Sequence, residues 1–304
     1  MMLLLTAALL PRLFWDAGPE TAPQLQQAGV EKIAVAADRV ASWKGLMEVD
    51  AADPAHAIRL VAPSVDYRAN QATASRAPWI NANGWRFLRA PAGEFVYDVK
   101  GAQAALAAAE AFSWNANALI RTDAAGLGPL GEMLRLLRGV PAEDLAPVAD
   151  FGFEDDGSTA AGEVMNLFVK GNLLFRIVPR PEPSLKIHVK LGTKDYPLED
   201  AKNPVKIAQM ARANLSDDRR SVRIYGSAVV VARLMAVPDR ARLHLLNYAG
   251  AERRVDGIRI RVAGEYSKAT VLPEMKILDF EKVDGGTEFT LPEIRTYAVV
   301  DLVK

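Results

Sequence analysis

The chain has 304 residues, of which 50% are hydrophobic and 24% charged, and its 37 basic side chains balance its 37 acidic ones. This composition is typical of a folded globular protein, and the length favours two or three domains. A formal net charge of zero gives no bulk field that would attract nucleic acid or an anionic membrane, so either partner would need a local patch, and we expect no nucleic acid.

Residues that commonly hold metals or cofactors are scarce. The sequence has no cysteine, which excludes disulfides, thiolate nucleophiles and cysteine-ligated metals. Its three histidines, His56, His188 and His244, lie far apart and lack metal-ligand spacing. The sequence also contains no phosphate-binding loop, dinucleotide fingerprint or serine-hydrolase elbow. We therefore expect no metal and no cofactor.

Residues 1–12 begin with an apolar run, Met1 to Leu10, which is too short to span a bilayer and has the length of the core of a secretory signal. A positive segment before it is missing. The alternative is a buried first strand or helix leading into Leu13. We expect a secreted or periplasmic protein without a stable membrane span, with the cytoplasm as the alternative.

The residues from 13 to 140 alternate short apolar strands with helices. Continuous apolar runs are typical of parallel strands that are buried on both faces. The pattern predicts an α/β region, either a contracted or incomplete (β/α) barrel or an open parallel sheet. Ligands of such folds bind at the carboxyl ends of the strands. The expected strands cover residues 13–18, 32–36, 57–61, 93–98 and 117–123, and the expected helices cover 20–29, 101–112 and 127–138.

Four aspartates lie at or just after these expected strands: Asp16, Asp66, Asp98 and Asp123. Because carboxyl ends of parallel strands meet at one edge, we expect these carboxylates to gather there as candidate catalytic groups. A single aspartate in this position is also a common helix cap or turn former, and that interpretation stays open for each of them.

The segment from Arg76 to Arg89 concentrates tryptophan, asparagine and arginine between a proline and a glycine. Tryptophan offers an apolar face and asparagine offers hydrogen bonds, which is the mixture that a sugar ring needs. The alternative is a buried corner with a tight turn at Gly84. The candidate substrate-binding residues are Trp15, Trp79, Asn81, Asn83, Trp85 and Arg86.

A proline-bounded linker, Pro141 to Pro147, opens a predicted β-α-β domain over residues 141–220 that resembles a flavodoxin-like domain. The expected elements are strands at 148–153, 172–178 and 185–191 and helices at 160–169 and 203–214. The acidic turn at 154–158 lacks the spacing of a calcium loop and is interpreted as a helix cap.

From residue 221 onward the hydrophobic period is two, which predicts an antiparallel β-sandwich over 221–304. Val237 to Arg240 is the clearest hairpin turn, and the arginines between Ile258 and Val262 are expected to face solvent. The expected strands cover 222–225, 228–234, 241–248, 257–262, 268–272, 287–291 and 296–302.

This order of parts resembles multidomain glycoside hydrolases of the β-galactosidase-like kind. The local similarities are Phe14 to Gly18 as a first barrel strand, Ala105 to Phe112 as a barrel helix, and Arg233 with Leu243 to Tyr248 in the terminal domain. The resemblance implies a catalytic (β/α)8 barrel, a flavodoxin- or amidotransferase-like domain and a small all-β domain. A complete barrel takes at least about 200 residues, and only about 140 precede the linker.

Three functions are compared. The first is a glycoside hydrolase with two carboxyl groups at the scissile bond. The second is a carbohydrate-binding relative that has kept the aromatic residues and lost the acid/base pair. The third is a structural or assembly protein whose sandwich mediates oligomers. The first two share carbohydrate as the expected partner.

Overall fold

The computed structural model describes residues 9–66, 78–142 and 144–304. Most of the apolar run within residues 1–12 therefore lies outside the described residues, as do Arg76 and Ala77 of the tryptophan segment. The chain divides into two compact units. The first comprises residues up to Ser64 together with Ala90–Asp144, and the second comprises Val65–Arg89 together with Leu145–Lys304.

Residues 65–89, which the sequence pattern placed in the amino-terminal domain, thus group with the second half of the chain. The predicted domain boundaries after residues 140 and 220 stay a prediction.

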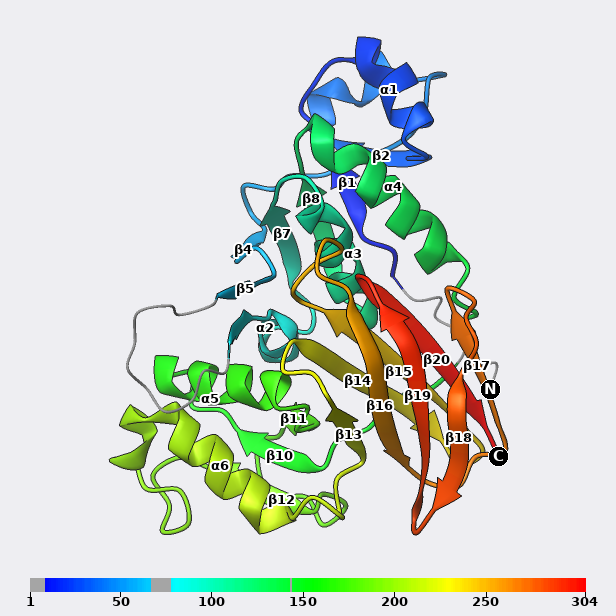
Figure 1. The fold of residues 1–304 in the computed structure, drawn as a ribbon. Coiled ribbons are helices and arrows are strands. Elements are labelled where there is room, and N and C mark those ends of the chain that lie inside the picture. Colours follow the sequence, from blue (N-terminus) through cyan, green and yellow to red (C-terminus); the bar gives the residue numbers. More distant parts are fainter. Residues whose placement is uncertain (1–8, 67–77, 143) are drawn as a thin grey trace, which may run out of the picture. The chain divides into compact units, whose positions relative to one another are not determined.

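The first unit contains a parallel sheet of six described strands in the order β3-β2-β1-β8-β7-β4 (Figure 1). The described strands of this sheet pair in parallel, and β3 and β4 form its two edges. The described residues therefore form an open parallel sheet, one of the predicted alternatives, and include no closed barrel. The strands are β1 Arg12–Phe14, β2 Lys32–Val35, β3 Glu48–Ala51, β4 Ile58–Leu60, β7 Glu94–Asp98 and β8 Asn117–Arg121.

Small residues let the helices of this unit pack closely. α3 (Gln103–Ser113) buries an almost continuous row of alanines. Gly131 of α4 (Ala124–Arg138) lies so near the carbonyl oxygen of Ala28 that a Cβ atom there would stand 1.8 Å from it. The other helices are η1 Pro19–Thr21, α1 Ala22–Gln27 and η2 Ala37–Trp43.

In the second unit, the chain from Leu145 onward first forms the predicted β-α-β motif. Its sheet is parallel, with three described strands in the order β11-β10-β12. Its core is aromatic, because Phe168 of α5 contacts Phe151, Phe153 and Phe175 with ring centroids 5.2 to 6.0 Å apart. The elements are β10 Phe151–Glu154, α5 Thr159–Lys170, β11 Phe175–Ile177, β12 Ile187–Lys190, η3 Asp200–Lys202 and α6 Pro204–Leu215.

The remaining strands form two antiparallel sheets, β13-β16-β19-β18 and β17-β20-β15-β14-β9 (Figure 1). Side chains of both sheets share one hydrophobic cluster, as expected for a sandwich. The strands are β9 Ala146–Pro147, β13 Val222–Tyr225, β14 Val230–Val237, β15 Arg240–Asn247, β16 Val255–Ala263, β17 Lys268–Leu272, β18 Leu278–Val283, β19 Gly286–Ile294 and β20 Tyr297–Val303.

The predicted turn between Val237 and Arg240 is confirmed, because these two residues pair where β14 meets β15. The expectation for the arginines of β16 is wrong in part: Arg261 is only 5% exposed. The linker also differs from expectation, since its last two residues form β9 at the edge of the sandwich.

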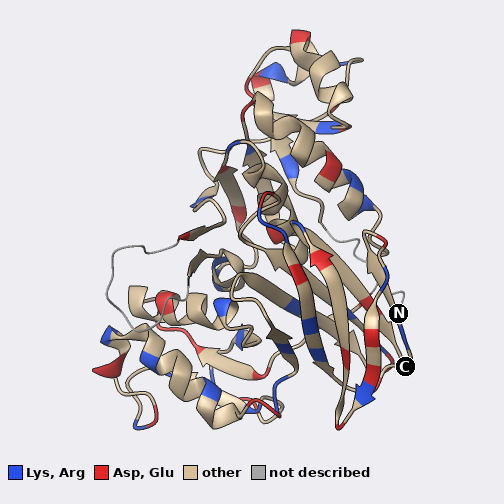
Figure 2. Ribbon diagram, viewed as in Figure 1, with Lys and Arg blue, Asp and Glu red and all other residues tan. Residues whose placement is uncertain are grey.

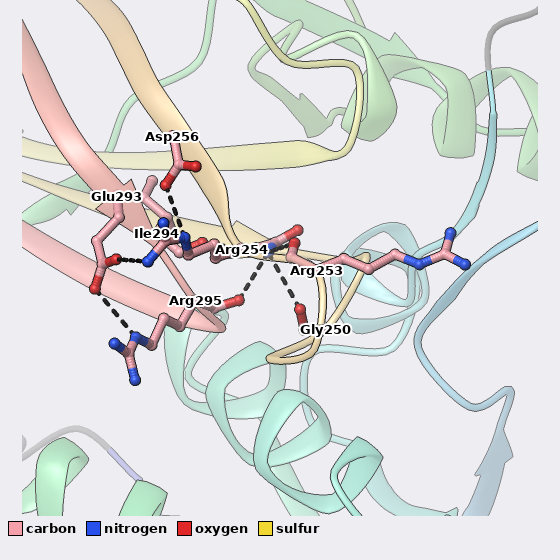
Figure 3. A network of polar contacts seen from close by, with 8 residues as sticks. Gly250, Arg253, Arg254, Asp256, Glu293, Ile294 and Arg295 are labelled. Carbon is pink, nitrogen blue, oxygen red and sulfur yellow. Dashed lines mark hydrogen bonds and ion pairs between the residues drawn. The ribbon is translucent and has the colours of Figure 1, made fainter.

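A buried amide organises the loop after β15 and the turn before β20. The Asn247 side chain is fully buried, and its amide nitrogen lies 2.7 to 3.4 Å from the carbonyl oxygens of Gly250, Arg253, Ile294 and Arg295, which share its two hydrogens. Ion pairs of Arg254 and Arg295 with Glu293 lie beside this network (Figure 3). The amide donors thereby satisfy backbone carbonyls that the strands leave unpaired.

Candidate functional site

The carboxyl ends of four neighbouring strands in the first unit carry charges of alternating sign. Asp16 follows β1, Arg121 ends β8, Asp98 ends β7, and Arg59 lies in β4, and these strands are adjacent in the order β1-β8-β7-β4. We call these four residues the charged edge. It contains two of the aspartates that the sequence singled out.

Arg121 joins the two carboxylates of the charged edge. One of its terminal nitrogens lies 2.8 Å from Asp16 and the other 3.2 Å from Asp98. The second oxygen of Asp98 accepts from Arg59 at 2.6 Å. The side chains remain accessible, with Asp16 59%, Asp98 45% and Arg121 35% exposed. The two carboxylates therefore face solvent on either side of one guanidinium.

This arrangement retains capacity for a ligand. A carboxylate has about four lone-pair sites, and the described contacts of Asp16 and Asp98 use only some of them. Planar guanidinium groups next to carboxylates offer fixed donors beside fixed acceptors. A polyhydroxylated ligand could meet both kinds of group at once. Within the described residues, no group of three or more acidic or histidine side chains could hold a metal ion.

The loop after β1, which carries Asp16, is held in place by Trp15 and Arg39. The backbone N–H of Trp15 donates to Ala34 at 2.9 Å, and its indole N–H donates to the hydroxyl of Thr21 at 2.8 Å. Arg39 donates to the backbone carbonyl oxygen of Asp16. Trp15 is only 8% exposed, so it supports the charged edge from within the fold and offers no open ring face.

Asp123, the third aspartate of this unit, caps a helix. Its carboxylate accepts from the backbone N–H groups of Gly126 at 3.0 Å and Gly101 at 2.9 Å. These bonds, that of Gly101 first, lower the pKa of Asp123. Asp123 thus makes the contacts of the cap interpretation at the amino end of α4.

The remaining predicted site residues belong to the second unit. β5 (Ser64–Asp66) pairs with β6 (Trp79–Asn81). The Asn81 amide donates to the Asp66 carboxylate at 2.9 Å, and the indole N–H of Trp79 donates to Asn81 at 3.0 Å. These three side chains form one hydrogen-bonded chain, with Asp66 exposed and Trp79 half-buried.

The rest of the tryptophan segment packs on α5. α2 (Gly84–Arg89) contacts that helix, and the ring of Trp85 lies against Gly162. The guanidinium of Arg86 stands 4.2 Å and that of Arg89 5.0 Å from the Trp85 ring centre. Arg89 also forms a bidentate ion pair with Asp155, in which its Nε and Nη2 atoms each lie 2.7 Å from a carboxylate oxygen. These contacts are those of the buried-corner alternative.

Asn83 is fully buried at the start of α2. Its backbone carbonyl accepts from the N–H of Arg86 at 2.8 Å, and its side-chain oxygen lies 3.2 Å from a guanidinium nitrogen of Arg86. The position of Asn83 makes it a turn residue of the segment. Its predicted role in substrate binding stays a prediction.

Three residues of these sites were not singled out from the sequence. Arg121 and Arg59 complete the charged edge, and Asn166 of α5 holds β6 by donating to the carbonyl oxygen of Ile80 at 3.0 Å. Arg121 could have been found from its place at the end of an apolar run, two residues before the predicted Asp123. Asn166 was harder to find from the sequence, because a single amide side chain within a helical pattern does not indicate a partner.

A separate polar cluster lies in the sandwich, on β15 and β20. His244, 6% exposed, has its Nδ1 atom 2.6 Å from the Tyr297 hydroxyl. Burial, followed by the nearby charges of Arg242 and Arg233, lowers the pKa of His244 to about 3. Arg242 is paired with Asp301 at 2.6 Å. His244 is thus a structural, neutral histidine at ordinary pH.

No protein-family model matches the chain, and no curated protein matches its sequence. Among solved structures, α-L-fucosidase isoenzyme 2 from Paenibacillus thiaminolyticus matches 70% of this chain with a TM-score of 0.52 and 9% sequence identity. The match covers 61% of the fucosidase chain.

Two other glycoside hydrolases match with lower scores. A maltogenic α-amylase from Thermotoga neapolitana gives a TM-score of 0.28 at 9% identity, covering 96% of this chain and 99% of its own. A family 30 xylanase from Clostridium acetobutylicum gives 0.24 at 8% identity, covering 97% and 95%. The likeness to the fucosidase is one of fold alone, and it does not single out the β-galactosidase-like kind. No helix in the described part of the chain is long and apolar enough to cross a membrane.

Proposed function

We propose that this protein binds or acts on a carbohydrate at the charged edge of its six-stranded sheet. The observation that carries the proposal is the pairing of Asp16 and Asp98 around Arg121 at the carboxyl ends of adjacent parallel strands. Ligands of open parallel sheets bind at these ends. The fold shared with α-L-fucosidase supports the same class of ligand.

Glycoside hydrolysis is the more specific proposal. It needs two carboxyl groups, about 5 Å apart for retention of configuration and further apart for inversion. Asp16 and Asp98 are the candidates, because one guanidinium contacts both and one ligand could meet both. In the second unit, Asp66 remains a proposed catalytic carboxylate, and the proposed ligand contacts are Trp79, Asn81, Asn83, Trp85 and Arg86.

A non-catalytic carbohydrate-binding protein is the second candidate. It is favoured by the contacts of Asp123, whose carboxylate caps α4. A structural role in an assembly is the third. Export is proposed from the apolar run at residues 1–12 alone.

The test compares the wild-type protein with Asp16→Asn and Asp98→Asn. Binding of neutral monosaccharides is followed by NMR and calorimetry, and turnover is followed on a panel of nitrophenyl glycosides that includes the α-L-fucoside. Asp239→Asn is the matched control, because this aspartate is 72% exposed in the β14–β15 turn.

Saturable binding that both edge variants weaken, and that Asp239→Asn leaves intact, supports carbohydrate binding at the charged edge. Turnover that either edge variant abolishes while binding persists supports hydrolysis. Binding without turnover on any glycoside selects the non-catalytic candidate. If the wild-type protein binds no sugar, or if the edge variants match the control in both binding and turnover, the proposal is wrong.

A further inference from the structure

A second charged surface lies on the outward face of the four-stranded sheet of the sandwich. Ile258, Ile260 and Val262 of β16 belong to the hydrophobic core, so the alternate residues Arg259 and Arg261 face the other way. Strand register places four charged residues in one row across this face. In order over β13, β16, β19 and β18 they are Arg223, Arg261, Glu288 and Glu281.

The two acidic members of the row both pair with Arg259, which lies outside the row. Arg259 donates to Glu288 at 2.8 Å and also forms an ion pair with Glu281. Glu288 is 17% exposed, so this pair is partly shielded from water. Arg223 and Arg261 therefore do not pair with the two glutamates of their own row.

Arg223 and Arg261 form no ion pair with any described residue. Arg261 donates from Nη2 to the backbone carbonyl of Asp284 at 2.8 Å, while its Nη1 atom is buried and lacks a hydrogen-bond partner in the described part of the chain. Arg223 is half-buried, and its Nε atom is likewise buried and without a described partner. Its guanidinium lies 5.8 Å from the ring centre of Tyr225.

Without a bound anion, the facing pair of Arg223 and Arg261 destabilises the folded protein. Residues directly opposite on antiparallel strands have Cβ atoms about 5 Å apart, and like charges in such a pair are destabilising. A buried donor without a partner adds the cost of its lost hydration. Asp218 is an exposed carboxylate whose pKa is lowered first by its hydrogen bond with the Ser216 side chain, and the positive charges of Arg219 and Arg223 add to this shift.

The geometry points to an oxyanion-binding site between β13 and β16, in which a phosphate, sulfate or carboxylate group is bound by Arg223 and Arg261. Guanidinium groups match these anions with paired hydrogen bonds. An anion would neutralise the two facing cations and supply acceptors for the unmatched donors. Figure 2 shows basic residues on neighbouring strands β13 and β16. The inference does not depend on the proposed function at the charged edge.

The test measures binding of inorganic phosphate, sulfate and glucuronate to the full chain by calorimetry at low ionic strength. Thermal unfolding is followed in parallel, with chloride added so that every buffer has the same ionic strength. The variants are Arg223→Gln, Arg223→Lys and Arg261→Gln. Arg295→Gln is the matched control, because Arg295 is a 70% exposed arginine that already pairs with Glu293.

We expect one saturable site for at least one oxyanion, with the affinity lowered at least about tenfold in Arg223→Gln and unchanged in Arg295→Gln. The anion affinity of Arg223→Lys should lie between those of the wild-type protein and Arg223→Gln, because lysine keeps the positive charge and lacks the planar guanidinium group. The bound anion should raise the Tm of the wild-type protein and not that of Arg223→Gln.

The three anions separate the sources of the ligand. Preference for phosphate or sulfate indicates a free or ester-linked tetrahedral anion, and preference for glucuronate indicates an acidic sugar. If the buried Arg261 variant does not fold, the Arg223 variants carry the test. The inference is overturned if no oxyanion binds saturably, or if Arg223→Gln and Arg295→Gln respond alike.

Discussion

The guanidinium of Arg121 donates to the carboxylate of Asp16 at 2.8 Å, although 105 residues separate the two in the sequence. The contact exists because β8 pairs with β1 in parallel and both carboxyl ends therefore lie at the same edge. Asp98 approaches the same guanidinium from β7 on the other side. The charged edge is thus a product of strand order.

Arg121→Gln should weaken ligand binding more than it weakens the fold. Its two ion pairs are largely exposed, so the free energy of unfolding should fall by at most about 1 kcal/mol. Carbohydrate binding should fall by about tenfold or more, because the two carboxylates would repel each other without the guanidinium between them. Urea denaturation and calorimetry measure the two effects.

Arg138→Gln is the control for this substitution. Arg138 pairs with Glu31 at 3.0 Å in the same unit, is 29% exposed and does not belong to the charged edge. It should show a similar small loss of stability with unchanged binding. Equal binding by wild type and Arg121→Gln would contradict the role given to Arg121.

Two glycines of α4 should respond in opposite directions to alanine. Gly131→Ala should lower the free energy of unfolding by about 3 kcal/mol or more, because its Cβ would stand 1.8 Å from the Ala28 carbonyl oxygen. Gly128→Ala should raise it by about 0.5 to 1 kcal/mol, because nothing lies within 4 Å of its Cβ and alanine favours helix. Chemical denaturation of both variants tests the close approach of α4 to the end of α1.

His244 should make the protein less stable as the pH falls below neutrality. The unfolded chain binds a proton on this histidine below about pH 6.5, whereas the folded protein keeps it neutral until about pH 3. The stabilisation is therefore present above pH 6.5 and is lost as the pH falls. Between pH 7 and pH 5 this residue alone should remove about 2 kcal/mol from the free energy of unfolding.

His244→Gln should flatten that dependence in urea denaturation, because glutamine does not titrate and can still bond to the Tyr297 hydroxyl. His56→Gln is the control, since the His56 side chain is 87% exposed. A pH dependence that is the same in wild type and His244→Gln would show that His244 titrates normally.

Asp217 should stabilise the protein against acid. Its hydrogen bonds to Arg212, and then to Arg220, lower its pKa from the ordinary 3.8 to about 2. Its contribution is complete above pH 3.8 and is lost as the pH falls from there towards 2. Because its side chain is 46% exposed, the loss should be at most about 1 kcal/mol.

The change in stability between pH 5 and pH 3 should therefore be smaller in Asp217→Asn than in wild type. Asp239→Asn should follow wild type, because Asp239 is 72% exposed. Urea midpoints across this pH range decide between the two outcomes. An Asp217→Asn curve parallel to that of wild type would show that the two arginines do not bind this carboxylate.

Local periodicity predicted most of the strands and helices. The apolar runs ending at Asp16 and Asp98 and the alternation around Ile258 are properties of a few consecutive residues, so the sequence reveals them directly. The hairpin at Val237 was predictable for the same reason, since proline and aspartate define a turn within four residues.

Features that depend on distant residues were not predictable in this way. Trp85 and Gly162 meet only because α2 packs on α5, and no local pattern announces a partner that far along the chain. Arg261 alternates like an exposed residue, yet its side chain is buried over the Gly285–Gly286 turn. Asp123 had the same local pattern as Asp98, and only the structure distinguishes a helix cap from a member of the charged edge.

Both units are assembled from two separated stretches of chain, which has a consequence for synthesis on the ribosome. β6 and α2 are translated well before α5, the helix against which they pack. The Trp85 side chain therefore remains exposed to solvent until more than seventy further residues have been synthesised. A fragment starting at Leu145 would expose the Gly162 face of α5 to water. We therefore expect that neither the part of the chain before Leu145 nor the part after it folds stably without the other.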